Sequence, residues 1–275
     1  LCYSTAQKTR TSSCRWVVLC TNRRLGKPRD LSIAGEEVYL GCIRRGLSSD
    51  SVDLPWRAQH VLVLGHGPYA TEHSRTALEH GAEHVTFGVR RHGIVCPEVV
   101  DYVSYIRAYD ETFSHPADGS MRIVVSWRQV YRTSKAKPPE CWAQGSFLPD
   151  GHAVSISDMY FVAHFLGVLR SAVGAACKFD DVGVTLSGGE RIEARIIIKA
   201  VGFESNEGNE RITGRSRLHC GCLVDDGLWT VVEAHPDGNF SSGAFGSYMD
   251  SVQFRCKMLV RRWQLVLAGQ QRLTS

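Results

Sequence analysis

Apolar positions change their spacing along the chain, and each spacing predicts a different element. Residues 61–64 (VLVL) form a short, continuous apolar run, typical of a parallel strand covered on both faces. Residues 69–80 suit a helix, Gly81 stands where a C-cap belongs, and residues 84–89 predict a second strand. A strand, a turn, a helix and a strand within about 30 residues have the size of a βαβ unit.

Two further stretches predict helices. Residues 96–111 favour one helix, with Pro97 in its first turn, and residues 157–174 favour another, with Ser157 or Asp158 as N-cap. Residues 114–152 contain Pro116, Pro138, Pro139 and Pro149 and support no assignment.

Other stretches predict strands and turns. Residues 15–21 predict a short strand, and residues 36–57 are expected to be irregular. Residues 182–203 combine alternating positions, a hairpin turn at Gly188-Gly189 and an apolar strand. The last segment, residues 253–270, predicts a basic amphipathic helix that docks on the chain's own core.

The turn after the first apolar run carries a candidate nucleotide site. Gly65, Gly67 and Ala70 have the G-x-G-x-x-A spacing. The first glycine permits a tight turn, the second lets the backbone approach a pyrophosphate, and the small third residue lets helix and strand pack closely. A plain strand-turn-helix is the alternative, because glycines also mark ordinary turns.

The end of the second predicted strand distinguishes between cofactors. NAD sites place an acidic residue there, whereas NADP sites offer arginine to the 2′-phosphate. Arg90 and Arg91 occupy this place, so we expect NADPH, with a pair of solvated surface arginines as the alternative. The expected cofactor-binding residues are Gly65, His66, Gly67, Pro68, Tyr69, Ala70, Glu72, Arg90, Arg91 and Gly202.

Composition narrows the class of protein. The 275 residues are 43% hydrophobic and 22% charged, which is ordinary for a globular chain. The net charge of +4 is too small to argue for nucleic acid, and no apolar run reaches the roughly 20 residues of a membrane span. The N-terminus has no signal-peptide pattern. We therefore expect a cytoplasmic protein with a small-molecule substrate.

The spacing of the cysteines is not typical of a disulfide-bonded protein or of a metal site. The 10 cysteines are scattered without a C-x-x-C pair, so we expect reduced thiols. Cys220 and Cys222 follow His219, but a structural zinc site needs a second ligand pair, and none appears. No metal is expected.

With the glycine turn, the arginine pair and the flanking strands in hand, the sequence resembles the flavin-containing monooxygenase group of two-dinucleotide-binding flavoproteins. The resemblance is carried by residues 61–91, by residues 17–35 before them and by residues 196–203 after them. It implies an α/β fold in which a Rossmann-like NAD(P)-binding domain (58–203) is inserted in a partial FAD-binding domain (1–57 and 204–275, with the C-terminal helix). It also implies hydride transfer from NADPH to FAD, followed by oxygenation of a nitrogen- or sulfur-containing small molecule.

The sequence departs from this family's pattern at the flavin end. No G-x-G-x-x-G unit precedes Arg15, and only Tyr39 and Gly41 match the family's F-x-G-x-x-x-H-x-x-x-[FY] fingerprint, where Arg45 and Ser49 replace the later positions. Leu1 in place of methionine suggests a missing N-terminal segment. We therefore expect this chain alone not to retain FAD, and we name no catalytic residue.

Three other functions were weighed against the sequence, and one of them does not fit it. Tyr131 and Lys135 match the Y-x-x-x-K pair of short-chain dehydrogenases, although Pro138 and Pro139 oppose a long helix there. A disulfide oxidoreductase of the two-dinucleotide class would need a redox-active cysteine pair, and the sequence contains no C-x-x-C pair. A non-catalytic or degenerate NADPH-binding module remains the principal alternative to an enzyme.

Overall fold

The computed structural model describes most of the central part of the chain. It covers residues 2–4, 9–11, 27–47, 53–101, 116–140, 142, 154–204, 222–225, 228–231 and the single positions 257, 260, 261, 264 and 268. The strand expected at residues 15–21 and most of the helix expected at residues 253–270 lie outside these residues. No helix in the described part of the chain is both long and apolar enough to cross a membrane.

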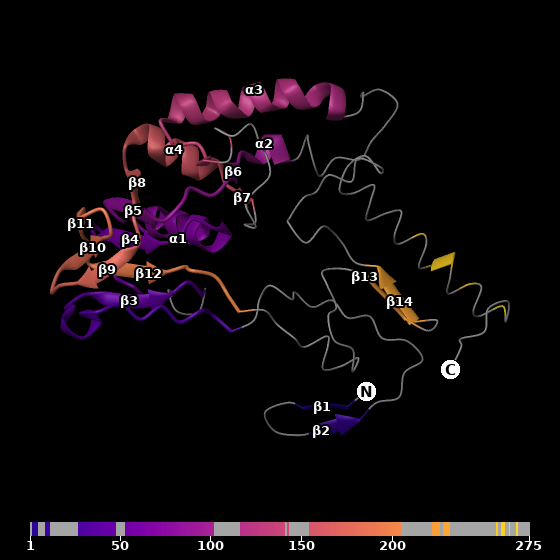
Figure 1. Ribbon diagram of the computed structural model, residues 1–275, viewed down its shortest axis with the longest axis horizontal. Coiled ribbons are helices and arrows are strands. Elements are labelled where there is room, and N and C mark those ends of the chain that lie inside the picture. The colour runs from indigo at the N-terminus through magenta and orange to yellow at the C-terminus, as the bar shows by residue number, and fades with distance from the viewer. Residues whose placement is uncertain are drawn as a thin grey trace.

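A parallel five-stranded sheet forms the centre of the fold (Figure 1). In spatial order its strands are β3 (Cys42–Arg45), β12 (Ile196–Lys199), β4 (His60–Leu64), β5 (His84–Val89) and β8 (Leu169–Val173). Every neighbouring pair is parallel. The mixed α/β class with a parallel sheet, predicted from the sequence, is therefore correct.

Helices cover one face of this sheet. They are α1 (Pro68–Glu79), α2 (Glu98–Asp101), α3 (Pro116–Ser134) and α4 (Asp158–Leu166), and Figure 1 shows α3 on the outer side of α4. Val61 and Val63 point toward the helices and share a buried cluster with Ala70 and Ala77. Small residues on α1 let the helix approach the strands closely.

Smaller β elements complete the described fold. The antiparallel sheet of β9 (Ala176–Phe179), β10 (Gly183–Leu186) and β11 (Arg191–Glu193) packs on the other face, where Leu62 and Leu64 join Val184 and Leu186 in a second buried cluster. Short elements are η1 (Glu36–Val38), β6 (Val95–Cys96) with β7 (Ser155–Ile156), β1 (Cys2–Ser4) with β2 (Thr9–Thr11), and β13 (Cys222–Asp225) with β14 (Leu228–Val231).

The βαβ unit has the predicted order. Strand β4 begins at His60, α1 runs from Pro68 to Glu79, and β5 spans the expected residues 84–89. Gly81 lies in the left-handed region (φ 86°) just after α1, where glycine has no Cβ to strain the turn. The covered strand predicted at residues 61–64 is likewise confirmed, because all four residues are buried.

Two sequence predictions were wrong, and one stretch without a prediction contains a helix. The helix expected over residues 157–174 begins at its predicted N-cap, Ser157, but ends at Leu166, because Gly167 adopts φ 76° and residues 169–173 join the sheet as β8. Residues 36–57, expected to be irregular, contain η1 and β3. Residues 114–152, left unassigned, contain the 19-residue helix α3, whose first residue is Pro116.

Candidate functional site

The glycine turn lies at the carboxyl edge of the parallel sheet. Gly65 follows β4 directly with φ 122°, a conformation that side chains strain. A Cβ at Gly65 would lie 2.4 Å from the carbonyl oxygen of Ala200, just after β12. The Gly65 N–H donates to the Gly88 carbonyl of β5 at 3.0 Å. Gly65 is thus required by the turn itself, through close contact with both neighbouring strands.

Gly67 serves a different purpose. It is the N-cap residue of α1, has ordinary extended backbone (φ −91°), and provides no side-chain cap. An added Cβ would meet no described atom within 4 Å. The fold therefore does not need glycine here, whereas a ligand approaching the backbone would.

The amino end of α1 offers backbone donors. The first N–H groups of a helix have no acceptor within the helix. Pro68 at the first position has no N–H, which leaves Tyr69 and Ala70 to present theirs beside Gly67. The first turn of α1 contains no acidic residue. Donors and helix dipole together favour an anion at this position.

Arg90 and Arg91 follow β5 directly, and both are exposed. Because β4 and β5 are adjacent and parallel, the arginines come from the same edge of the sheet as the glycine turn. The topology therefore brings together the two parts of the predicted NADPH site.

His66 connects these two parts. Its Nδ1 accepts a hydrogen bond from the Gly93 N–H at 3.0 Å, and its Nε2 lies 3.2 Å from the Tyr160 hydroxyl. Because Nδ1 is the acceptor, the neutral ring carries its proton on Nε2 and donates it to Tyr160. Burial, aided by His92 and His164 nearby, lowers the pKa of His66 to about 3. His66 is therefore neutral near pH 7 and holds the loop after the arginines against the glycine turn.

Two more buried histidines surround this contact. His92 lies 2.9 Å from Glu140 through its Nδ1, and its ring is 5.7 Å from that of His66. His164 lies 2.8 Å from the Tyr160 carbonyl through its Nδ1, and burial lowers its pKa. Burial by itself raises the pKa of Glu140, but hydrogen bonds from His92 lower it overall.

The remaining expected site residues differ in how they lie relative to the glycine turn. Tyr69 packs its ring on Phe203, with centroids 4.9 Å apart, and Gly202 beside it has φ 92°. Ala70 is fully buried under the turn. Glu72 is exposed and lies 3.6 Å from Arg75, so it pairs within its own helix.

Sequence reasoning missed several residues that complete the site. Tyr160 and Phe203 contact the turn from elements distant along the chain, and His92 and Gly93 contact it from the loop after the arginines. None belongs to a motif, whereas their partners in the glycine turn, His66 and Tyr69, were among the expected site residues. Their roles depend on contacts that no local pattern contains.

The Y-x-x-x-K pair does not form an exposed catalytic site. The Tyr131 hydroxyl is buried, accepts from the Val95 N–H at 2.9 Å and donates to the Val95 carbonyl at 3.0 Å. Lys135 follows the last residue of α3 with φ 64°. The tyrosine anchors α3 on β6, which is a structural role.

Comparisons with known proteins gave matches of fold only. No protein-family model matches the sequence, and no curated protein matches it. Among solved structures, cyclohexanone monooxygenase from Rhodococcus sp. Phi1 bound to NADP+ is 13% identical, with a TM-score of 0.49, over 68% of this chain and 46% of that one. Oxidized steroid monooxygenase bound to NADP is 12% identical (TM-score 0.48; 68% and 46%). OTEMO in complex with FAD and NADP is also 12% identical (TM-score 0.48; 74% and 51%).

The chain spans about half the length of these structures. Two of them are monooxygenases. At identities of 12–13% the likeness concerns the fold alone. The function of this chain has to follow from its own residues.

Proposed function

We propose that this chain is the NADPH-binding part of a flavin-dependent monooxygenase-like oxidoreductase. The observation that carries the proposal is the carboxyl edge of β4 and β5, where a glycine turn opens α1 beside Arg90 and Arg91. The pyrophosphate would lie at Gly67, against the N–H groups of Tyr69 and Ala70, and the 2′-phosphate would lie at the arginines.

The division of labour in such an enzyme explains the rest of the site. FAD, when bound, would supply hydride acceptance and reaction with oxygen. The residues described here bind and orient the nucleotide, and His66 holds its two anchoring segments together. This account requires no acid, base or nucleophile from this domain.

The inserted-domain arrangement is part of the proposal. The two segments that bound the sheet domain run side by side: the Arg29 N–H donates to the Gly202 carbonyl at 3.0 Å and the Glu204 N–H donates to the Lys27 carbonyl at 2.8 Å. Antiparallel entry and exit strands are what a domain inserted into another needs. They favour an entry near residue 28, earlier than the boundary at residue 57 suggested by the sequence.

Calorimetric titration of NADPH and NADH tests the cofactor assignment. NADPH should bind more tightly to the wild type, and Arg90→Ala/Arg91→Ala should reduce NADPH affinity without changing NADH affinity. Each arginine-phosphate contact contributes about 1.5–3 kcal/mol, or roughly 10- to 150-fold in affinity. Arg132→Ala, an exposed arginine near the end of α3, is the matched control and should change neither affinity. Equal affinities of the wild type for both nucleotides would rule out the NADPH assignment.

A second candidate is an NADPH-binding module without flavin chemistry. The observation in its favour is the departure from the family's F-x-G-x-x-x-H-x-x-x-[FY] fingerprint, in which Arg45 and Ser49 replace the later positions. Both candidates share the nucleotide site and differ only in whether this chain holds FAD.

A further inference from the structure

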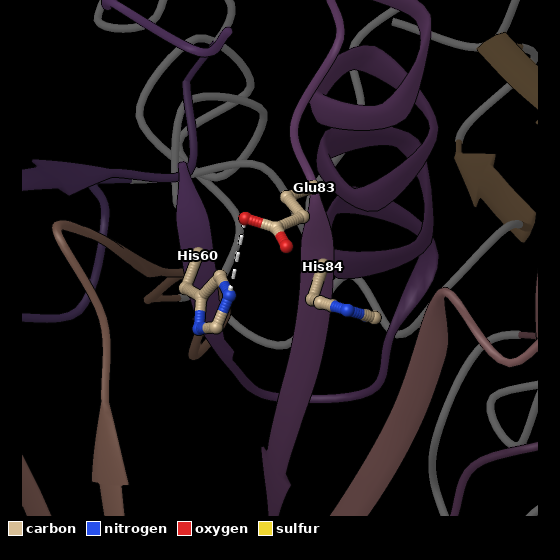
Figure 2. A group of neighbouring side chains, drawn as sticks. All are labelled: His60, Glu83 and His84. Carbon is tan, nitrogen blue, oxygen red and sulfur yellow. Dashed lines mark ion pairs between the residues drawn. The ribbon is translucent and has the colours of Figure 1, made fainter. Parts of the chain in front are cut away.

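Three metal-ligating side chains meet at the edge of the sheet opposite the glycine turn. His60 is the first residue of β4, His84 is the first residue of β5, and Glu83 directly precedes it. Figure 2 shows the Glu83 carboxylate directed toward the His60 ring, with His84 beside them on the neighbouring strand. All three side chains are exposed.

The strand register brings the two histidines together. His60 and His84 are direct partners in the parallel pairing of β4 with β5, and their ring centroids are 5.2 Å apart. His60 Nε2 lies 3.6 Å from a Glu83 carboxylate oxygen. One ligand atom from each residue lies within 4.8 Å of the other two.

The backbone under these side chains is well held. The Glu83 N–H donates to the Gln59 carbonyl at 3.0 Å, and the Arg195 N–H donates to the His60 carbonyl at 2.9 Å. The side chains themselves are exposed, 52% for His60 and 59% for Glu83. Ligands of a four-coordinate metal at 2.0–2.1 Å are about 3.3 Å apart, so small rotations close the site.

We propose that His60, Glu83 and His84 bind a divalent late first-row transition metal ion, of the class of Zn²⁺ or Ni²⁺. Two imidazoles and one carboxylate form a ligand set that such ions prefer, whereas Mg²⁺ and Ca²⁺ prefer oxygen alone. Three protein ligands leave a coordination position for water. The bound ion cross-links the first residues of β4 and β5, and binding only to the folded state raises the temperature of unfolding.

A plain surface ion pair is the alternative account. Such a pair accounts for the close approach of Glu83 and His60, but it does not involve His84. The metal site requires all three residues, so the effect of substituting each one on metal affinity distinguishes the two accounts.

Ni²⁺ titration of the whole chain tests the proposal, with binding measured by calorimetry and histidine ring signals by NMR. In the wild type, Ni²⁺ below one equivalent should broaden the ring signals of His60 and His84 first. His60→Asn and His84→Asn should each weaken the site at least about tenfold, and Glu83→Gln by a similar factor. His80→Asn is the matched control, because His80 is exposed and lies just after α1, outside the cluster.

The chain has other cysteines and histidines, so the comparison between variants is decisive. Loss of one binding event in the three cluster variants, with the His80 variant unchanged, supports the site. Ni²⁺ affinity that is the same in His60→Asn/His84→Asn as in the wild type would overturn it, as would the absence of any broadening of the His60 ring signals in the wild type. All substitutions are at exposed positions and should fold normally, and none touches the nucleotide site, so this test is independent of the proposed function.

Discussion

The two glycines of the turn differ in what a side chain would meet. A Cβ at Gly65 would collide with the Ala200 carbonyl, and the residue has φ 122°, whereas a Cβ at Gly67 would meet no described atom. One glycine is therefore needed for folding and the other, we infer, for the ligand. The motif spacing alone does not distinguish these roles.

Substitution separates the two roles. Gly67→Val should abolish nucleotide binding and leave the fold intact, because only the approach of the pyrophosphate is blocked. Gly65→Ala should lower the free energy of unfolding by about 1–3 kcal/mol from backbone strain, and further from the clash. Circular dichroism, urea unfolding and NADPH calorimetry on both variants check this. A folded Gly67→Val protein that binds NADPH normally would contradict the proposed phosphate site.

His66 makes stability depend on pH with a definite sign. Its pKa is about 3 in the folded chain and about 6.5 when unfolded, so the unfolded state binds more protons between these values. Stability is therefore fully present above pH 6.5 and falls as the pH drops toward 3. This group alone should cost about 2 kcal/mol between pH 7 and pH 5.

Urea unfolding at pH 7 and pH 5 measures this contribution. His66→Gln keeps an acceptor for the Gly93 N–H but cannot titrate, so its stability should fall about 2 kcal/mol less than that of the wild type over this range. His164 and the carboxyl groups titrate in both proteins, so the difference isolates His66. His80→Gln serves as control and should behave as the wild type. Equal pH dependence of His66→Gln and the wild type would be inconsistent with a neutral buried His66.

At the scale of elements, α3 is held by its aromatic side chains. Tyr131 and Trp127 both donate to the Val95 carbonyl in β6, at 3.0 and 2.8 Å. Their spacing of four residues puts them on one face of the helix, where they contact Trp142. The pattern that resembled a catalytic pair is therefore an anchor between two elements.

Tyr131→Phe tests the anchor. The Val95 N–H would lose its acceptor inside the protein, which should lower the free energy of unfolding by about 1–3 kcal/mol. Thr133→Val, at an exposed position of the same helix, should change it by less than about 0.5 kcal/mol. NADPH affinity should be unchanged in both variants. A different result would favour the short-chain dehydrogenase hypothesis instead. In that result the wild type oxidises NADPH, and Tyr131→Phe loses this activity with its stability unchanged.

Most elements in the core were predictable because their signals are local. The βαβ unit, the turn at Gly188-Gly189 and the strand at residues 196–199 each follow from spacing or turn chemistry within a few residues. The end of α4 was missed although Gly167 marked it, because the apolar sequence of β8 after it resembles a helix continuation. Helix α3 was not predicted because residues 114–152 contain four prolines, and proline disrupts the interior of a helix. None of these prolines lies in the interior of α3: Pro116 is its first residue, and the next two lie beyond its end.

At the scale of the whole molecule, flavin retention depends on parts that the nucleotide domain does not supply. A dinucleotide site of this kind needs a glycine turn that presents backbone donors at a helix N-terminus. The described sheet contains one such turn, at Gly65–Ala70, which we assign to NADPH. The flavin would need a second.

The purified 275-residue chain should therefore bind NADPH and be colourless. Its visible spectrum should lack a flavin band, and NADPH should not be oxidised, since no hydride acceptor is retained. Adding FAD should not restore a bound band after gel filtration. A yellow preparation with near-stoichiometric flavin would contradict this prediction and favour the enzyme over the NADPH-binding module.

The α/β class, the position of the glycine turn and the arginine pair after the second strand could be predicted from the chain alone, because these depend on neighbours within about 30 residues. Which distant groups lie around each site became visible only in the folded chain. Lys199 pairs with Glu36 at 2.6 Å across the fold. His66 is neutral because burial, aided by His92 and His164, lowers its pKa. His60 meets His84 because two strands align in one register. Each of these depends on a contact across the fold, whose geometry follows from packing and strand register and leaves no periodic signal in the chain.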